Sequence, residues 1–269
     1  DSGRSRLPKG LIRDYPQYEV RSCMLDVARF YMPLDYLGEI TRYMAYFKLN
    51  EIRLHINDNG GESDISFRVE SKRYPQINTG LKADEIYSQE DYRNYQKDAL
   101  KYGIEVVTEI DTPAHSGFVK LARPDLSLDG FHIDLSKEDS LPFIESLLDE
   151  FLDGEDPVIQ STKFHIGTDE YDTAYSEQVR AYMDALITYV NGKGYETRFW
   201  GSLGGNGFAG ETPVNTNATA HFWGAYLADF NQMIEDGAIT AETAKIGYVG
   251  AFPFAEVISG FTSFFLGAR

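Results

Sequence analysis

Asp169 and Glu170 stand side by side just after a short apolar run, KFHIG, at residues 163–167. A pair of carboxylates can divide one reaction, because one group can exchange a proton while the other stays ionised and stabilises positive charge. In a barrel of alternating strands and helices, catalytic side chains lie just past the carboxyl ends of the strands. The pattern therefore predicts that both residues are catalytic; the alternative is that they cap the following helix.

Other polar and aromatic side chains also follow predicted strands. If the strands are parallel neighbours, these side chains converge on one rim of the barrel. Such a mixture suits a pyranose, because aromatic rings stack on its apolar face and charged groups bind its hydroxyls. For each tryptophan, core packing is an equal alternative. These candidates are Arg21, Asp58, Asp111, His115, Trp200 and Trp223.

The predicted elements alternate between strands and helices, which favours an α/β fold with a parallel sheet. So many repeats favour a (β/α)8-type TIM barrel over an open sheet. The polar stretch 62–88 is expected to be a long loop on the substrate side. The expected strands are 20–27, 51–56, 104–110, 164–166, 198–200 and 220–223, and the expected helices are 33–50, 89–102, 141–152 and 176–190.

We expect this barrel to be incomplete. Residues 245–249 are a candidate seventh strand, and no stretch reads as an eighth. A closed barrel needs that last strand, so one edge must stay open or be covered in another way. We divide the chain into an N-terminal lead (1–19), a barrel (20–237) and an atypical C-terminal strand-and-helix segment (238–269).

Composition disfavours several classes of partner. The net charge of −17 over 269 residues argues against nucleic acid and anionic membrane surfaces, which select basic patches. No apolar run approaches the roughly 18 residues of a membrane span, and residues 1–10 lack the apolar core of a signal peptide. The single cysteine, Cys23, excludes an internal disulfide framework. Oligomeric state stays open.

Metal-dependent hydrolysis is the rival chemistry. Three histidines and the neighbouring aspartates offer ligands for zinc or manganese. Metal barrels usually carry a close cluster such as His-x-His, whereas His55, His115 and His165 are scattered one to a strand. We therefore expect no metal and no cofactor, with His55 and His165 as hydrogen-bonded core residues. The sequence also has no Gly-rich phosphate loop, nucleophile elbow or HExxH motif.

Four motifs at these strand ends resemble glycoside hydrolase family 20, which contains β-N-acetylhexosaminidases and lacto-N-biosidases. They keep their order across residues 21–223, and the last two together are highly specific. The motifs are RSCMLDVAR at 21–29, HIND at 55–58, EIDTPAHS at 109–116 and HIGTDE at 165–170.

The resemblance implies substrate-assisted cleavage with retention, in which the 2-acetamido oxygen of the sugar attacks the anomeric carbon. Glu170 would protonate the departing oxygen and later activate water. Asp169 would orient the acetamido N–H and stabilise the oxazolinium ion. This division requires Glu170 to hold a proton near working pH while Asp169 stays ionised. Asp111, His115 and Glu109 would tune Glu170.

The resemblance also implies roles in substrate binding. Arg21 and Asp58 would bind the sugar, and Trp200 and Trp223 would wall the acetamido pocket. The family's seventh strand carries a tyrosine that bonds the acetamido oxygen, and Tyr248 would stand in for it. The C-terminal residues otherwise resemble a segment of a basic-membrane-protein type solute-binding protein, which suggests a fused terminus.

The expected function is removal of a terminal β-linked N-acetylhexosamine from a glycan. One alternative is a lacto-N-biosidase that releases a disaccharide, and another is an inactive or truncated sugar-binding barrel. The family commonly has two glycines where this chain has Gly167 and Thr168, and many members have paired aspartates where it has Asn57 and Asp58. Sugar preference therefore stays open. Glycan substrates suggest an extracellular or cell-surface location.

Overall fold

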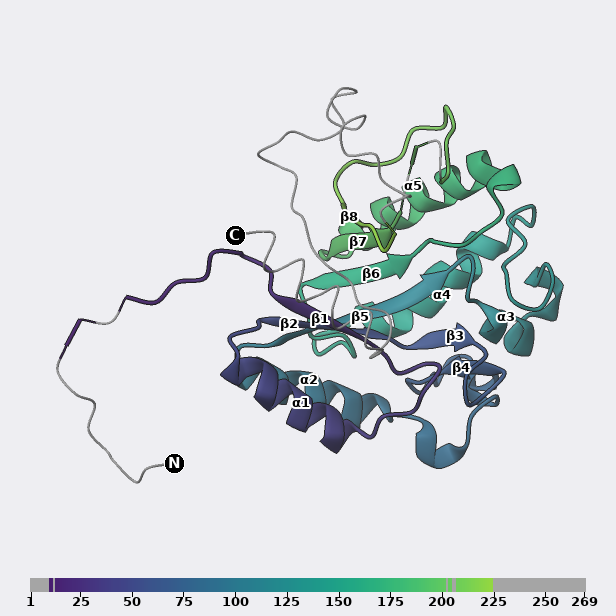
Figure 1. The fold of residues 1–269 in the computed structure, drawn as a ribbon. Helices are drawn as coiled ribbons and strands as arrows, with labels where there is room; N and C mark the ends of the chain where they lie inside the picture. Colours follow the sequence, from purple (N-terminus) through teal and green to yellow (C-terminus); the bar gives the residue numbers. More distant parts are fainter. Residues whose placement is uncertain (1–9, 12, 202, 205–206, 225–269) are drawn as a thin grey trace.

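The structure is a computed structural model that describes residues 10–224 except 12, 202, 205 and 206. Six strands form one sheet in the order β1-β2-β5-β6-β7-β8, and each neighbouring pair is parallel. The sheet curls into a half-barrel (Figure 1), which confirms the predicted incomplete TIM barrel. The strands are β1 (Ser22–Asp26), β2 (Glu51–His55), β5 (Glu105–Thr112), β6 (Lys163–Gly167), β7 (Glu196–Trp200) and β8 (Thr219–His221).

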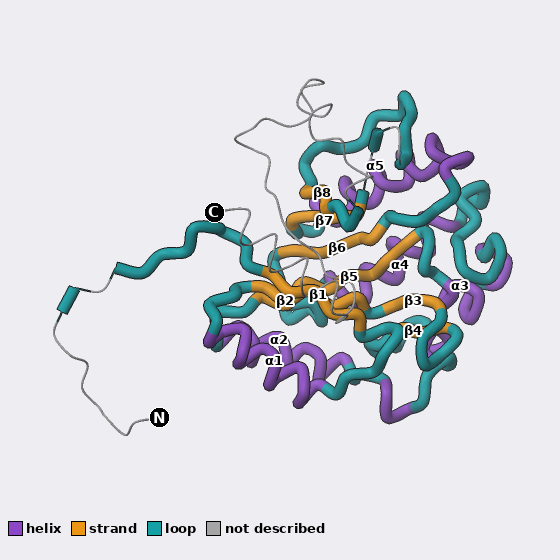
Figure 2. Tube along the Cα trace, in the orientation of Figure 1, coloured by secondary structure: helices purple, strands orange, loops and turns teal. Residues whose placement is uncertain are grey.

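Helices cover the outer side of the sheet and lie close to their predicted positions (Figure 1, Figure 2). The α2 helix begins where Ser88 accepts a hydrogen bond from the Asp91 N–H, and it ends before Gly103, whose φ of 74° favours glycine. The predicted helices are α1 (Leu34–Tyr46), α2 (Gln89–Lys101), α4 (Ser140–Leu152) and α5 (Ser176–Gly192). A shorter helix, α3 (Gly117–Ala122), lies where no helix is predicted.

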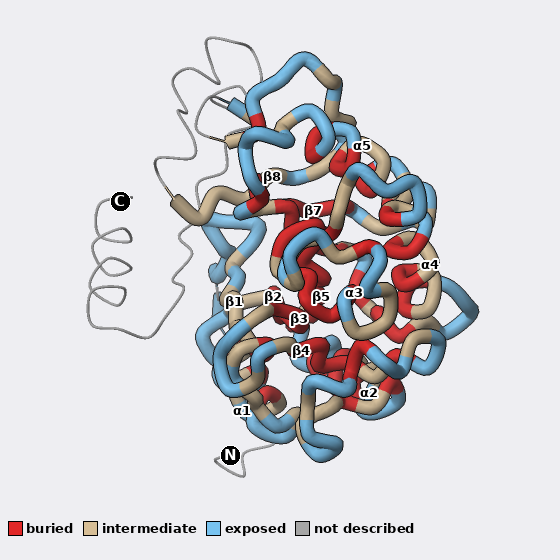
Figure 3. Tube along the Cα trace, turned by 90° about the vertical axis from the view of Figure 1, so that its right-hand side faces the viewer, coloured by how far each residue is buried: buried red, intermediate tan, exposed pale blue. Residues whose placement is uncertain are grey.

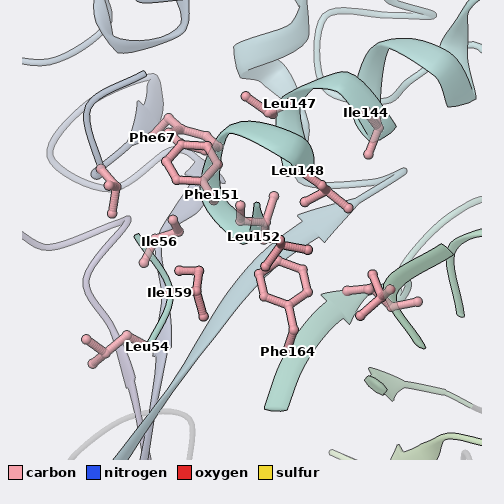
Figure 4. Packing of buried hydrophobic residues seen from close by; sticks show 14 of the residues in the cluster. Leu54, Ile56, Phe67, Ile144, Leu147, Leu148, Phe151, Leu152, Ile159 and Phe164 are labelled. Carbon is pink, nitrogen blue, oxygen red and sulfur yellow. The ribbon is translucent and has the colours of Figure 1, made fainter. Parts of the chain in front are cut away.

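The main apolar core lies between these helices and the sheet. In Figure 4, Phe151 and Leu152 of α4 lie beside Phe67 and Phe164, and all four are buried. The rings of Phe67 and Phe151 are 5.9 Å apart between centroids. Figure 3 shows that burial continues through the central strands, while the outer loops are exposed. Each buried Leu or Phe contributes about 1.5–3 kcal/mol, so this core holds the strand ends in place.

A short hairpin replaces part of the expected loop. β3 (Asn57–Asn59) pairs antiparallel with β4 (Ile65–Phe67), although the sequence reads as loop from Asn57 onward. Just past β4, the buried Arg68 side chain donates to the carbonyl oxygens of Val27 at 2.6 Å and Ala28 at 2.9 Å, which attaches the hairpin to the turn after β1. Two 3₁₀ helices, η1 (Pro75–Asn78) and η2 (Ala83–Glu85), follow. Much of the stretch 62–88 is therefore ordered against the barrel.

The β1 strand is only half-buried, whereas the sequence predicts a buried strand. Among the described residues it pairs with β2 alone, so one of its edges lacks a strand neighbour. Tyr248, the candidate strand 245–249 and the segment 238–269 lie outside the described residues, and the division of the chain into domains stays a prediction. None of the helices in the described part of the chain is long and apolar enough to span a membrane.

Candidate active site

The turn after β6 carries Asp169 and Glu170 past the carboxyl end of the strand. Three of its residues have positive φ, at 71° for Gly167, 82° for Thr168 and 50° for Glu170. Such conformations are costly for residues with side chains and persist only where the surroundings hold them. Here the Thr168 N–H donates to Asp111 Oδ1 at 3.0 Å. The adjacent strand β5 therefore fixes the turn from one side.

A second strand and a histidine complete this support. The Thr168 hydroxyl donates to the carbonyl oxygen of Trp200 in β7 at 3.0 Å. His165 is buried, and its Nδ1 accepts from the Gly167 N–H at 3.1 Å. Burial holds the pKa of His165 well below its usual range, so the ring is neutral and suited to accept that bond. His165 is thus a core residue, with one ring nitrogen hydrogen-bonded.

Neither carboxylate of the pair caps a helix. The short helix η4 (Thr173–Tyr175) is capped by Asp172, whose carboxylate accepts from the Ala174 N–H at 2.9 Å. The α5 helix begins only at Ser176. The structure thus leaves Asp169 and Glu170 available for chemistry.

His115 joins the carboxylates into one cluster. Its Nε2 lies 3.2 Å from Glu170 Oε2, 3.7 Å from Asp169 Oδ1 and 4.0 Å from Asp111 Oδ2. Its Nδ1 lies 2.9 Å from Asp58 Oδ1. Burial disfavours the charged ring, but the surrounding carboxylates, Asp111 and Asp58 foremost, outweigh this effect and raise the pKa of His115 to about 12. At neutral pH the ring is therefore an imidazolium ion.

A further layer of charge holds His115 in place. Asp58 also accepts from Arg29 Nη2 at 2.7 Å and from His55 Nε2 at 2.6 Å. Although burial alone would raise it, the pKa of Asp58 lies well below its usual range because His115 and His55 donate to the carboxylate. His55 Nδ1 lies 2.6 Å from Glu109 Oε1. Burial opposes charge on His55, but bonds to two carboxylates raise its pKa well above the usual value.

The pKa shifts of the two carboxylates run opposite to those that their expected roles require. Burial raises the pKa of Asp169, and burial together with the Asp169 charge raises that of Asp111. The hydrogen bond from His115 lowers the pKa of Glu170. The cause is position: of the adjacent pair, Glu170 lies closer to the imidazolium ion, at 3.2 Å against 3.7 Å, while Asp169 is buried beside Asp111. These shifts in pKa favour ionisation of Glu170 and oppose ionisation of Asp169.

Asp169 and Glu170 also differ in their access to solvent. The Glu170 side chain is 52% exposed, whereas that of Asp169 is 16% exposed. Asp169 Oδ1 is buried and has no hydrogen-bond partner among the described residues. A buried acceptor without a partner is rare in folded proteins and is suited to an incoming donor. One carboxylate therefore faces solvent and the other offers a buried acceptor.

A cavity of about 270 Å³ opens beside Glu170. Arg29, Asn59, Phe131 and His132 line it although the sequence does not single them out as site residues. Arg29 ends the RSCMLDVAR motif, which is the one signal that could have identified it. The described lining residues are Arg29, Asp58, Asn59, Ala114, His115, Phe131, His132 and Glu170.

The structure brings Glu109 and Trp200 together beneath the cluster. Trp200 is buried, and its Nε1–H donates to Glu109 Oε1 at 2.9 Å. The Arg53 guanidinium lies 4.0 Å from the centre of the indole. Despite burial, Glu109 has a pKa well below its usual range, because the protonated His55 ring donates to it at 2.6 Å and the Arg53 guanidinium lies 3.3 Å away. In this structure Trp200 therefore packs and hydrogen-bonds within the half-barrel.

Arg21, Trp223 and Tyr248 are the remaining predicted site residues. Arg21 precedes β1, at the amino end of the sheet, and its guanidinium donates to the carbonyl oxygens of Lys48 and Tyr18, both at 2.6 Å. Trp223 is half-buried, two residues past the end of β8. Tyr248 is outside the described residues. The structure thus assembles the predicted acid–base residues and places Arg21 at the opposite end of the sheet.

Charge argues against a metal ion at this site. Three groups have ligand atoms close enough to hold one: Asp26 with His55 and Asp58; His55 with Glu109 and Asp111; and Asp111 with His115 and Asp169. Each group contains His55 or His115, and the carboxylates around both rings favour the protonated form. A metal ligand must be a deprotonated imidazole nitrogen. The cluster is therefore better suited to proton chemistry than to metal binding.

Known proteins share this fold and its motifs. The sequence model of the glycosyl hydrolase family 20 catalytic domain matches residues 18–200. β-Hexosaminidase subunit A2 of Dictyostelium discoideum is 32% identical over 161 residues, which cover 58% of this chain and 29% of that protein. Subunit B2 of the same organism is 31% identical over 66% of this chain and 36% of its own length. The chain thus spans about a third of these relatives.

A solved structure of a Streptomyces plicatus β-hexosaminidase mutant in complex with product (GlcNAc) aligns with a TM-score of 0.68 at 22% identity. The alignment covers 82% of this chain and 45% of that one. At this identity the likeness shows the fold alone. The family match, in contrast, covers more than half of the sequence and includes every motif up to Trp200. The chain therefore belongs to glycoside hydrolase family 20.

Proposed function

We propose that this chain forms the catalytic part of a retaining glycosidase that removes a terminal β-linked N-acetylhexosamine from glycans. The observation that carries the proposal is the contrast within one turn. Asp169 offers a buried Oδ1 that has no hydrogen-bond partner among the described residues, and Glu170 faces an open cavity. A 2-acetamido group can donate its N–H to the first while the glycosidic oxygen accepts a proton from the second.

The two steps follow from this placement. In the first, the acetamido carbonyl oxygen forms a bond to the anomeric carbon as the bond to the leaving oxygen breaks. Glu170 gives its proton to that oxygen, and Asp169 stabilises the positive charge on the oxazolinium ring. In the second, water attacks the anomeric carbon, its proton passes to Glu170 and the ring opens. Each step inverts the configuration at the anomeric carbon, so the two steps together retain it.

Substrate binding moves both carboxylates toward the state they need. A sugar beside Glu170 displaces water, and this desolvation favours the protonated acid. A developing cation beside Asp169 favours its ionised form. The bound substrate therefore opposes the pKa shifts that burial imposes on Asp169 and that His115 imposes on Glu170.

Several roles rest on the family resemblance alone. We propose that Trp200 and Trp223 line the acetamido pocket, with Tyr248 bonding the acetamido oxygen. A product complex of GlcNAc with the Streptomyces plicatus enzyme supports N-acetylglucosamine as the sugar. Release of a disaccharide is the alternative specificity. We further propose an extracellular or cell-surface location, where such glycans are exposed.

A non-catalytic sugar-binding barrel is the second candidate. One observation favours it: among the described residues the sheet ends at β1 and β8 without closing. Catalysis requires groups held within about 0.5 Å of their working positions, and an open barrel holds its rim less firmly than a closed one. Binding of N-acetylglucosamine without turnover would distinguish this candidate.

The test is hydrolysis of an aryl N-acetyl-β-glucosaminide by the purified chain and by Glu170→Gln and Asp169→Asn. We expect each variant to lose activity by roughly 10²–10⁴-fold, which is the usual contribution of a positioned acid or base. A thiazoline that imitates the oxazoline should inhibit the parent. Glu90→Gln, at an exposed position on α2, is the matched control. A folded parent that binds the sugar without hydrolysing it would contradict the proposal.

A further inference from the structure

We infer that the loop Ser127–Ile133 is a platform for the leaving group and that Phe131 stacks on a sugar ring there. The inference rests on the proposed function, because it assumes that Glu170 protonates the departing oxygen. It goes further by assigning the cavity beside Glu170 to the sugar on the far side of the scissile bond. The site would then select substrates in which the leaving group is itself a pyranose.

The cavity lies on the side of Glu170 where the leaving group is expected. Its described lining includes Glu170 but not the adjacent Asp169. Asp169 is the expected partner of the acetamido group, so the terminal sugar that carries this group lies on the Asp169 side of the turn. The oxygen that accepts the Glu170 proton belongs to the leaving group. The cavity that Glu170 shares with Phe131 and His132 is therefore on the leaving-group side.

The loop is held firmly enough to act as a platform. Asp129 Oδ1 accepts from the N–H groups of Phe131 and His132, both at 2.9 Å, and the Gly130 N–H donates to Ser127 Oγ at 3.0 Å. An isolated bridge pairs Ser127 with Ile133. A rigid loop binds a ligand without first losing its own conformational freedom.

The same loop is fastened to the catalytic segment after β5. The Ser116 N–H donates to the carbonyl oxygen of Phe131 at 2.8 Å, and the Ile133 N–H donates to that of Pro113 at 2.8 Å. Ser116 follows His115 directly, so the loop and the imidazolium ion share one backbone support. A shift of Phe131 relative to His115 would have to strain these bonds.

The chemistry of the surface suits a sugar. Phe131 is 50% exposed, which leaves an aromatic face that solvent can reach. Flat apolar rings of this kind stack on the C–H face of a pyranose. His132 Nδ1 donates to Asp129 Oδ2 at 2.7 Å, which leaves Nε2 to hydrogen-bond with a hydroxyl group. An apolar face beside polar groups is the pattern that binds a carbohydrate.

The experiment compares two substrates that differ only in the leaving group. One is N-acetyl-β-glucosaminyl fluoride, whose leaving group is too small to reach Phe131, and the other is a β-linked disaccharide of N-acetylglucosamine. Phe131→Ala should lower kcat/KM for the disaccharide about tenfold, the effect of losing one buried aromatic contact. It should leave kcat/KM for the fluoride unchanged. Phe131→Tyr, which keeps the ring, should restore the disaccharide rate.

The control is Phe47→Ala, which removes an exposed phenylalanine just past α1, outside the residues that line the cavity. It should change neither rate. If Phe131→Ala slows both substrates equally, or neither, the leaving-group assignment is wrong while the proposed function stands. If the parent chain does not hydrolyse the fluoride, the proposed function fails and this inference fails with it.

Discussion

Gly167 and Asp111 are packed so closely that a Cβ atom on Gly167 would lie 1.7 Å from Asp111 Oδ1. Gly167 also has a φ of 71°, which a residue with a side chain rarely adopts. The glycine therefore lets the catalytic turn approach the neighbouring strand, where Asp111 accepts from the Thr168 N–H.

We predict that Gly167→Ala displaces the turn and lowers kcat/KM about 100-fold, as a shift of roughly 1 Å in catalytic groups does. The free energy of unfolding should fall by more than the roughly 1–2 kcal/mol that left-handed backbone costs a residue with a side chain. Activity assays and chemical denaturation measure the two effects.

The matched control for this change is Gly103→Ala. Gly103 has a similar φ of 74°, and a Cβ there would meet nothing within 4 Å. It should therefore lose stability through backbone strain alone and keep full activity. Equal effects from the two substitutions would show that the contact with Asp111 is unimportant.

We predict that His115→Gln changes the pH dependence of hydrolysis. The His115 ring lowers the pKa of Glu170, so removing its charge lets that pKa rise. The basic limb of the kcat/KM profile, which reports loss of the proton from the acid in the free enzyme, should move to higher pH. A purely structural role for His115 would lower the rate at every pH and leave the limb in place.

Local patterns predict much of this fold. The strands β2, β5 and β6 stand out as apolar runs, and α2 and α4 follow from helical spacing and from Gly103. Because the carboxyl ends of parallel strands meet at one edge of the sheet, the order of elements alone places Asp111, His115, Asp169 and Glu170 close together, as the structure does.

The features that local sequence patterns do not predict depend on contacts between residues far apart in the chain. The β3–β4 hairpin is attached to the turn after β1, where Arg68 donates to the carbonyl oxygens of Val27 and Ala28. These partners lie about 40 residues away in the sequence, so no local pattern predicts the contact. Phe131 and His132 reach the cavity through a loop whose anchors, Pro113 and Ser116, lie more than ten residues away in the chain. The pKa shifts also depend on which carboxylate of the adjacent pair lies closer to His115, a distance that sequence order does not contain.

We predict that Glu105 stabilises the fold above its usual titration range. It lies on β5 and accepts from Lys163 Nζ at 2.7 Å, Ser161 Oγ at 2.7 Å and the Thr162 N–H at 2.8 Å. Burial opposes its charge, but these bonds lower the pKa of Glu105 to about 2, against 4.5 for the free group. Its contribution to stability is thus complete above pH 4.5 and lost as the pH falls toward 2.

Glu105→Gln should therefore reduce the free energy of unfolding at pH 7 by roughly 1–3 kcal/mol. The difference from the parent should shrink as the pH falls from 4.5 to 2, measured by denaturant titration at each pH. Glu90→Gln, on the exposed face of α2, is the control and should change neither quantity. A difference that stays constant across this range would contradict the assigned bonds.

We predict that chelation leaves hydrolysis unchanged. His55 and His115 each hydrogen-bond to carboxylates through their ring nitrogens, and the protonated rings cannot bind a metal ion. The measurement is turnover of an aryl N-acetyl-β-glucosaminide before and after dialysis against a chelator. Loss of activity that zinc or manganese restores would establish the rival, metal-dependent chemistry.

The central claim is that the acetamido oxygen of the substrate is the nucleophile, with Asp169 orienting it and Glu170 supplying the proton. The most direct test is kcat/KM for aryl β-glucosaminides whose N-acetyl group carries zero, one, two or three fluorine atoms. Fluorine withdraws electrons from the carbonyl oxygen and weakens it as a nucleophile, so we predict a steep fall in rate with each added fluorine. Rates that do not depend on fluorine, measured on an active parent chain, would contradict the account.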